Sequence, residues 1–309
     1  MLCLDRVSKR FGARAVLQEL SFRVAPGEVY GLLGPNGAGK STTFNLICNL
    51  LVPDSGTVSI AGAPAAAVRA GVIGVVAQQT ALYRNLSCRQ NLEFFGALHG
   101  FWGRRLQHRI TECLEQVGLV DRAHSIVRDL SGGMQRRLHV AVALVHEPQL
   151  VILDEPSTGL DVESRHEQWA LIRRLQQRGA AVLLATHLLD EAEALCSRLG
   201  LLQAGALVAE GTPDELRSRV QAAEVALVQS PDVEAVLAVA ARHQLETRRF
   251  EHDVALWLPR KMELRELAEL LAEAPITSLA RRPVTLADAY VELTRPPAPP
   301  AAEPRDELA

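Results

Sequence analysis

The segment GPNGAGKST, residues 34–42, combines the residue types that hold a phosphate group. It fits the pattern GxxxxGK[ST], in which glycines let backbone N–H groups converge on phosphate oxygens. Lys40 can reach the β and γ phosphates of a nucleotide, and the Ser41 hydroxyl can bind a magnesium ion. The alternative is a glycine-rich turn with an exposed lysine. An expected strand before the segment and an expected helix after it favour a phosphate loop.

A second anion-binding pattern, LSGGM, occupies residues 130–134. A Ser-Gly-Gly sequence that opens a helix presents unpaired N–H groups and the positive end of the helix dipole. Taken alone, the pattern is equally typical of an ordinary capped helix. Its presence raises the question of which phosphate a second site would bind.

Two acidic residues follow the apolar run LVIL at residues 150–153. Asp154 and Glu155 are expected where a buried strand leaves the sheet, which is where ligands of open α/β sheets bind. Asp154 could support the magnesium ion through its water shell, and Glu155 could orient or deprotonate an attacking water. Such a pair can also cap a helix, but the phosphate loop favours the catalytic role.

The elements that must position these residues alternate between strands and helices. Short strands are expected within 2–7, 20–33, 57–60 and 71–76, and helices near 39–49, 103–117 and 133–146. The run AAVLLATH predicts another buried strand, which His187 closes. A lone histidine there is more often structural. The alternation predicts an α/β fold with a mostly parallel sheet.

Residues 1–220 are expected to form this large domain, and residues 221–295 a small α+β accessory domain. The order expected in the second part is βαββαβ followed by a closing helix over 284–294, which favours a ferredoxin-like unit. Residues 296–309 are rich in Pro and Ala and predict a disordered tail.

Composition excludes several classes of protein. The net charge of −3 offers no basic footprint, so nucleic acid is not an expected partner. The five cysteines are scattered without a CxxC pair, which argues against disulfides or zinc and favours a reducing cytoplasm. No secretory signal is recognisable, and no apolar run is long enough to span a bilayer.

The four segments GPNGAGKST, LSGGMQRR, LVILDEPSTGLD and LLATH, in this order, resemble the ATP-binding cassette (ABC) family of ATPases over about residues 1–220. The resemblance implies a P-loop ATPase with a mostly parallel sheet, a small antiparallel subdomain and a helical subdomain, and it implies ATP and Mg²⁺ as cofactors. It assigns catalytic roles to Glu155, His187 and Gln78, and magnesium contacts to Ser41, Gln78 and Asp154. His187 would hold the γ phosphate. The implied ATP-binding residues are Phe11, whose ring would stack on adenine unless it is a buried plug, and Gly34, Pro35, Asn36, Gly37, Ala38, Gly39, Lys40, Ser41 and Thr42.

The resemblance also implies an answer for the second anion-binding pattern. In this family two nucleotide domains pack head to tail, and the signature segment Ser131, Gly132, Gly133 and Met134 closes over the ATP of the other subunit. Asp161 would cross to the neighbouring subunit. One set of motifs favours a homodimer, and a heterodimer with a related chain is the alternative.

Gln78 introduces an aromatic-rich stretch, residues 79–103, which we expect to receive a cytoplasmic helix of a separate permease. The alternative is that Phe94, Phe95, Phe101 and Trp102 pack a helical subdomain.

The ending RRPVTLADAYVELT is similar to that of exporter ATPases for drug, polyketide or lipid-type substrates, and it implies an accessory domain that supports the dimer. The chain would then lie on the inner face of the membrane.

The alternative function is that of a soluble cassette ATPase that acts in translation or DNA maintenance. Intact Lys40 and Glu155 argue against a scaffold without hydrolysis.

Overall fold

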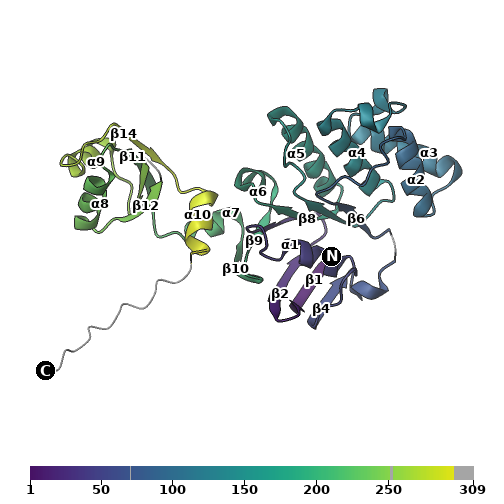
Figure 1. Cartoon of the computed structure of the whole chain (residues 1–309), viewed down its shortest axis with the longest axis horizontal. Helices are drawn as coiled ribbons and strands as arrows, with labels where there is room; N and C mark the ends of the chain where they lie inside the picture. Colours follow the sequence, from purple (N-terminus) through teal and green to yellow (C-terminus); the bar gives the residue numbers. More distant parts are fainter. Residues whose placement is uncertain (70, 251–252, 296–309) are drawn as a thin grey trace. The chain divides into compact units, whose positions relative to one another are not determined.

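The structure, a computed structural model, describes residues 1–69, 71–250 and 253–295 of the 309-residue chain. It divides into two compact units, Met1–Leu216 and a second that begins at Arg217 (Figure 1). The predicted tail at 296–309 lies outside the described residues.

A six-stranded sheet forms the centre of the first unit, with the order β10-β9-β3-β8-β7-β6. Its strands are β3 (Val29–Leu33), β6 (Ile73–Val76), β7 (Leu150–Asp154), β8 (Ala181–Thr186), β9 (Arg198–Gln203) and β10 (Ala206–Gly211). All neighbours are parallel except β10 and β9. Leu33 pairs with Thr186, and Ala185 pairs with Asp154. The segments that follow β3, β7 and β8 therefore leave the sheet at one edge.

A second, antiparallel sheet has the order β2-β1-β4-β5. Its strands are β1 (Leu2–Phe11), β2 (Arg14–Val24), β4 (Ser55–Ile60) and β5 (Ala63–Pro64). The region expected to be extended over 20–33 is thus divided between two sheets, because Gly27, with a φ of 68°, turns the chain between β2 and β3. Side chains from both sheets, such as Phe22 and Leu183, share one apolar core.

Seven helices connect or follow these strands within the described residues, and the last of them runs past Leu216 into the second unit. They are α1 (Lys40–Ile47), α2 (Cys88–Leu98), α3 (Gly103–Gln116), α4 (Gly132–Leu144), α5 (Val162–Gln177), α6 (Leu189–Leu195) and α7 (Pro213–Ser218), with short 3₁₀ turns at Ala65–Ala67, Val120–Arg122 and Val127–Asp129. α2, α3 and α4 pack together as a helical subdomain (Figure 1). α2 was not predicted, although Ser87 and Gln90 form a capping box at its start. No helix in the described part of the chain is both long and apolar enough to cross a membrane.

The second unit contains a four-stranded antiparallel sheet in the order β12-β13-β11-β14. Its elements are β11 (Glu224–Gln229), α8 (Val233–Arg242), β12 (Glu246–Phe250), β13 (Asp253–Leu258), α9 (Leu264–Leu270), β14 (Ser278–Arg282) and α10 (Leu286–Leu293). α8 and α9 cover one face, where Val239 and Leu267 join the core with Leu256 (Figure 1). This strand order is that of a split βαβ unit. Together the two units confirm the predicted α/β fold with a small α+β addition.

Candidate functional site

The phosphate loop, residues 34–42, follows β3 and opens α1. Gly39 has a φ of 117°, a left-handed conformation that favours glycine. Gly34 lies so close to β9 that a Cβ there would be 2.4 Å from the backbone oxygen of Leu202. The two glycines therefore let the loop turn tightly and keep its backbone close to the sheet.

Lys40 extends back across its own loop. Its Nζ donates hydrogen bonds to the backbone oxygens of Gly34 at 2.6 Å and Pro35 at 3.2 Å. Burial lowers the pKa of Lys40, and the nearby carboxylates of Glu155 and Asp154 oppose this shift. The ammonium group is thus fixed between the loop and the acidic end of β7.

The two acidic residues at the end of β7 have different environments. Burial raises the pKa of Asp154, and the charge of Glu155 adds to the rise, while Lys40 and Arg136 oppose it. Glu155 has a φ of 49°, unusual for a residue other than glycine. Its N–H donates to the backbone oxygen of Ala185 at 2.9 Å, which holds this turn against β8. Such strained backbone is typical of functional sites.

The Glu155 carboxylate brings three of the predicted site residues together. Its Oε1 forms a hydrogen bond with Nδ1 of His187 at 3.0 Å. Its Oε2 accepts from Nε2 of Gln78 at 3.4 Å and from the Thr158 hydroxyl at 3.3 Å. His187 and Gln78 lie in the segments that follow β8 and β6, so the parallel sheet brings both side chains to the acid.

A cavity of about 330 Å³ joins the phosphate loop to the acidic residues. Its walls are formed by Phe11, Arg14, Val16, Pro35, Asn36, Gly37, Gly39, Lys40, Ser41, Thr42, Gln78, Asp154 and Glu155. Phe11 is 50% exposed, so its ring is available for stacking and is not a buried plug. Arg14 and Val16 were missed by the sequence analysis. Their position just after Phe11, on the neighbouring strand of the hairpin, is the signal that could have identified them.

The donor set around this cavity suits a hard divalent cation. The Ser41 hydroxyl, the Gln78 amide and the Asp154 carboxylate all offer oxygen atoms to it. Among residues 1–69, 71–250 and 253–295 no group of three or more His, Cys, Asp and Glu side chains gathers as in an all-protein metal cage. Few protein ligands, completed by water and substrate phosphates, are typical of magnesium sites.

The signature segment, residues 131–134, lies apart from this cavity. Ser131 is exposed and caps α4 by accepting a hydrogen bond from the N–H of Met134 at 3.2 Å. Asp161 is exposed too and caps α5 by accepting from the N–H of Ser164 at 2.8 Å. This backbone hydrogen bond, with that of the Ser164 hydroxyl, lowers the pKa of Asp161. The described lining of the cavity includes neither the signature segment nor Asp161.

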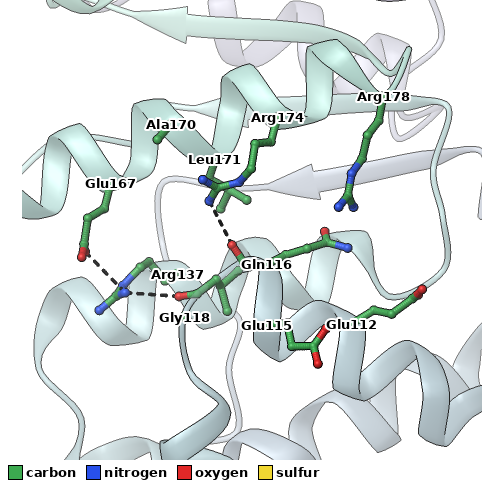
Figure 2. A pocket seen from close by; sticks show the side chains of 11 residues that line it. Glu112, Glu115, Gln116, Gly118, Arg137, Glu167, Ala170, Leu171, Arg174 and Arg178 are labelled. Atoms are coloured by element: carbon green, nitrogen blue, oxygen red, sulfur yellow. Dashed lines mark hydrogen bonds and ion pairs between the residues drawn. The ribbon is translucent and has the colours of Figure 1, made fainter.

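A larger cavity, of about 720 Å³, lies between α3, α4 and α5 and contains none of the predicted site residues (Figure 2). Arg174 donates to the backbone oxygen of Gln116 at 3.0 Å, and Arg137 donates to that of Val117 at 3.2 Å and pairs with Glu167 (Figure 2). These arginines stabilise the carbonyl end of α3. The smaller cavity, with its phosphate loop and acidic residues, is the candidate active site.

Comparisons with known proteins show which family the chain belongs to. The family model described as ABC transporter matches residues 17–158. The chain is 42% identical over 231 residues to a Nod factor export ATP-binding protein of Paraburkholderia xenovorans, covering 74% of this chain and 76% of the relative. It is 45% identical to a daunorubicin resistance ATP-binding protein of Streptomyces coeruleorubidus, with 70% of each chain covered.

A solved structure with a similar fold is the dimeric, post-hydrolysis state of an ATP-binding cassette bound to ADP and Pi. Its TM-score is 0.61 and its identity 28%, and the match covers 69% of this chain and 98% of that one. The extent and identity of these matches favour a transporter subunit over the soluble rival. The chain belongs to the ABC transporter family as an ATP-binding protein, and it is an ATPase.

Proposed function

We propose that the chain hydrolyses ATP at the cavity between the phosphate loop and β7, with Glu155 as the base that activates water. The observation that carries this proposal is the hydrogen-bonded set of Glu155, His187 and Gln78 beside Lys40. Lys40 and the loop N–H groups bind the phosphates, Phe11 stacks on adenine, and His187 holds the γ phosphate.

Magnesium, when bound, neutralises charge on the β and γ phosphates. Ser41, Gln78 and Asp154 hold it, partly through water. Glu155 accepts the proton of the attacking water through the carboxylate that His187 and Gln78 orient. Burial of this carboxylate, whose side chain is 9% exposed, keeps competing water away from the base.

We further propose that the working unit is a homodimer in which each signature segment covers the ATP of the other subunit. Support comes from the exposed start of α4, which does not line the cavity of its own chain, and from the dimeric state of the similar cassette. A γ phosphate that joins two helix N-termini stabilises the dimer only while it is present. Asp161 lies in the dimer-crossing loop, and the accessory domain supports the dimer.

A separate permease supplies the membrane-spanning part in this proposal and places the chain on the inner face of the membrane. Of the aromatic residues near α2, Phe101 is buried, whereas Phe94 and Trp102 are exposed, Trp102 to 68%. The apolar side chain of Leu98 is exposed beside them. Tyr83 packs edge-on against Phe94 with ring centroids 4.7 Å apart. This exposed apolar surface suits a permease helix. The relatives' names support export of a drug-like, lipid or polyketide-type substrate.

The Glu155→Gln variant tests the proposed base. The amide keeps the shape of the side chain but cannot accept the proton, so turnover should fall by about 10² to 10⁴-fold while ATP binding persists. Steady-state hydrolysis and equilibrium nucleotide binding measure the two effects, and size-exclusion chromatography should show an ATP-dependent dimer. Turnover at the wild-type rate would remove Glu155 from this role.

Purification of the chain from detergent extracts tests the permease proposal. If no membrane protein co-purifies with the chain, the result would contradict that proposal.

A further inference from the structure

Arg136 is a buried cation on α4 that no expected role explains. It lies five residues after Ser131, and only 7% of it is exposed. Within residues 1–69, 71–250 and 253–295, its guanidinium forms no salt bridge with a carboxylate, and its hydrogen bonds all go to backbone oxygens. The acceptors are Pro156 at 3.0 Å from Nε, Gln78 at 2.7 Å and Ala77 at 3.3 Å from Nη1, and Glu155 at 2.6 Å and Asp154 at 3.3 Å from Nη2.

These acceptors belong to two separate segments that both carry proposed catalytic side chains. One segment leaves β6 and contains Gln78, and the other leaves β7 and contains Glu155. Gln78 and Glu155 lie outside the residue pairs that join β6 to β7 and β7 to β8. Glu155 also has the left-handed φ of 49°. A planar fork of N–H donors can hold several oxygens at fixed angles to one another, which a point charge cannot.

We propose that Arg136 is a positioning residue that links α4, the helix bearing the signature segment, to Gln78 and Glu155. This inference rests on the proposed function. Arg136 holds the two side chains at hydrogen-bond distance from each other through their own backbones. When α4 closes on a partner's nucleotide, its shift is transmitted through the hydrogen-bonded side chain of Arg136. The shift reaches Glu155, the proposed base, and Gln78, which lies beside the proposed permease surface. Because Arg136 does not touch the substrate, it acts on turnover rather than on nucleotide affinity.

The alternative is that Arg136 only stabilises the fold, and its neighbour Arg137 provides the matched control. Arg137 lies on the same helix and also donates to a backbone oxygen, that of Val117, but it faces the cavity of Figure 2 and pairs with Glu167. Replacing either arginine by lysine keeps the charge and removes the fork. The two variants therefore differ in which segments lose their hydrogen bonds.

The experiment measures steady-state ATP hydrolysis and thermal unfolding of the full chain for Arg136→Lys and Arg137→Lys. We expect Arg136→Lys to lower kcat by about 10-fold or more while KM for ATP stays within about 3-fold. Arg137→Lys should keep both constants within about 2-fold. Added to Glu155→Gln, Arg136→Lys should cause no further loss, because the base is already absent.

Three results overturn the inference. They are a kcat of Arg136→Lys within 2-fold of the wild type, equal losses in both lysine variants, and a rise in KM that accounts for the loss. If Arg136→Lys does not fold, Arg136→Gln is measured in the same way, and failure of both to fold assigns Arg136 to stability alone. Normal turnover in Glu155→Gln contradicts the proposed function instead, whatever Arg136 does.

Discussion

The starts of α1 and α4 are both glycine-rich helix N-termini, but their surroundings differ. The start of α1 is enclosed: its loop lies against β9, and acidic residues and Gln78 share its cavity. The start of α4 is open: Ser131 caps its own helix, and a Cβ built on Gly132 would meet no described heavy atom within 4 Å beyond its chain neighbours and the backbone of its own helix. One chain thus builds an enclosed cavity at α1 and only an exposed surface at α4. This difference is what a composite site shared by two copies requires.

The largest expected effect concerns mixed subunits, each of which carries a defect at one of the two helix starts. Lys40→Ala should lower ATP binding and turnover by more than about 100-fold, because the phosphates lose their closest cation. Ser131→Arg should keep ATP binding, since α1 is intact, but lose turnover as severely. A mixture of the two variants should recover activity, because one site in a mixed dimer combines an intact α1 with an intact α4.

Hydrolysis measured over a series of mixing ratios tests this prediction, with each variant alone as the control. Absence of any recovery would mean that the two helix starts act within one chain or that both sites must be intact together.

A smaller effect is expected from adding one methyl group at each helix start. Gly34→Ala should destabilise the fold by roughly 1–3 kcal/mol, because its Cβ would meet the backbone of Leu202. Gly132→Ala should leave stability unchanged or slightly higher, since alanine favours helices. It should still reduce turnover about 10-fold or more if the partner's phosphate approaches there.

Urea unfolding and ATP hydrolysis of the two glycine variants separate these effects. A Gly132→Ala variant with full activity would show that no phosphate comes close to the open helix start.

The last prediction concerns mild acid, which should lower the free energy of unfolding through two buried histidines in and next to α4. His139 lies in α4 and His146 just after it, and burial lowers the pKa of each to about 4. Above pH 6.5 both states are neutral, so the full stability is present. As pH falls from 6.5 towards 4, the unfolded chain takes up protons first, and each histidine costs about 1.4 kcal/mol per pH unit.

Urea unfolding between pH 7 and 5 measures this slope. His146→Gln should make the slope shallower, because glutamine does not titrate and its amide can still reach the backbone oxygen of Ile73, which His146 contacts at 3.0 Å. An unchanged slope would assign the acid effect to other groups.

Sequence patterns predicted local elements well and boundaries between elements less well. The strands around the phosphate loop and before Asp154 and His187 are apolar runs that can only be buried, so their positions were predictable. α2 was missed because its sequence mixes aromatic and polar residues, and only the Ser87 capping box marks its start. The region 20–33 is extended on both sides of Gly27, and nothing in its sequence indicates that its two strands belong to different sheets.

The candidate site was predictable where a motif is contiguous. The glycines of residues 34–42 and the acids at 154 and 155 each stand together in the chain, so a contiguous pattern identifies them. Arg14 and Val16 belong to no motif, and only their place just after Phe11, across the hairpin of β1 and β2, indicates that they reach the cavity.

The sequence by itself determined the family, the phosphate loop and the acidic strand end, because these depend on residues adjacent in the chain. Only the tertiary structure decided that Gln78 and His187 both meet Glu155, and that Arg136 joins the β6 and β7 segments through five backbone oxygens. The physical reason is that parallel strands distant in sequence end at one edge of the sheet. The contacts made there depend on strand register, which no local pattern encodes.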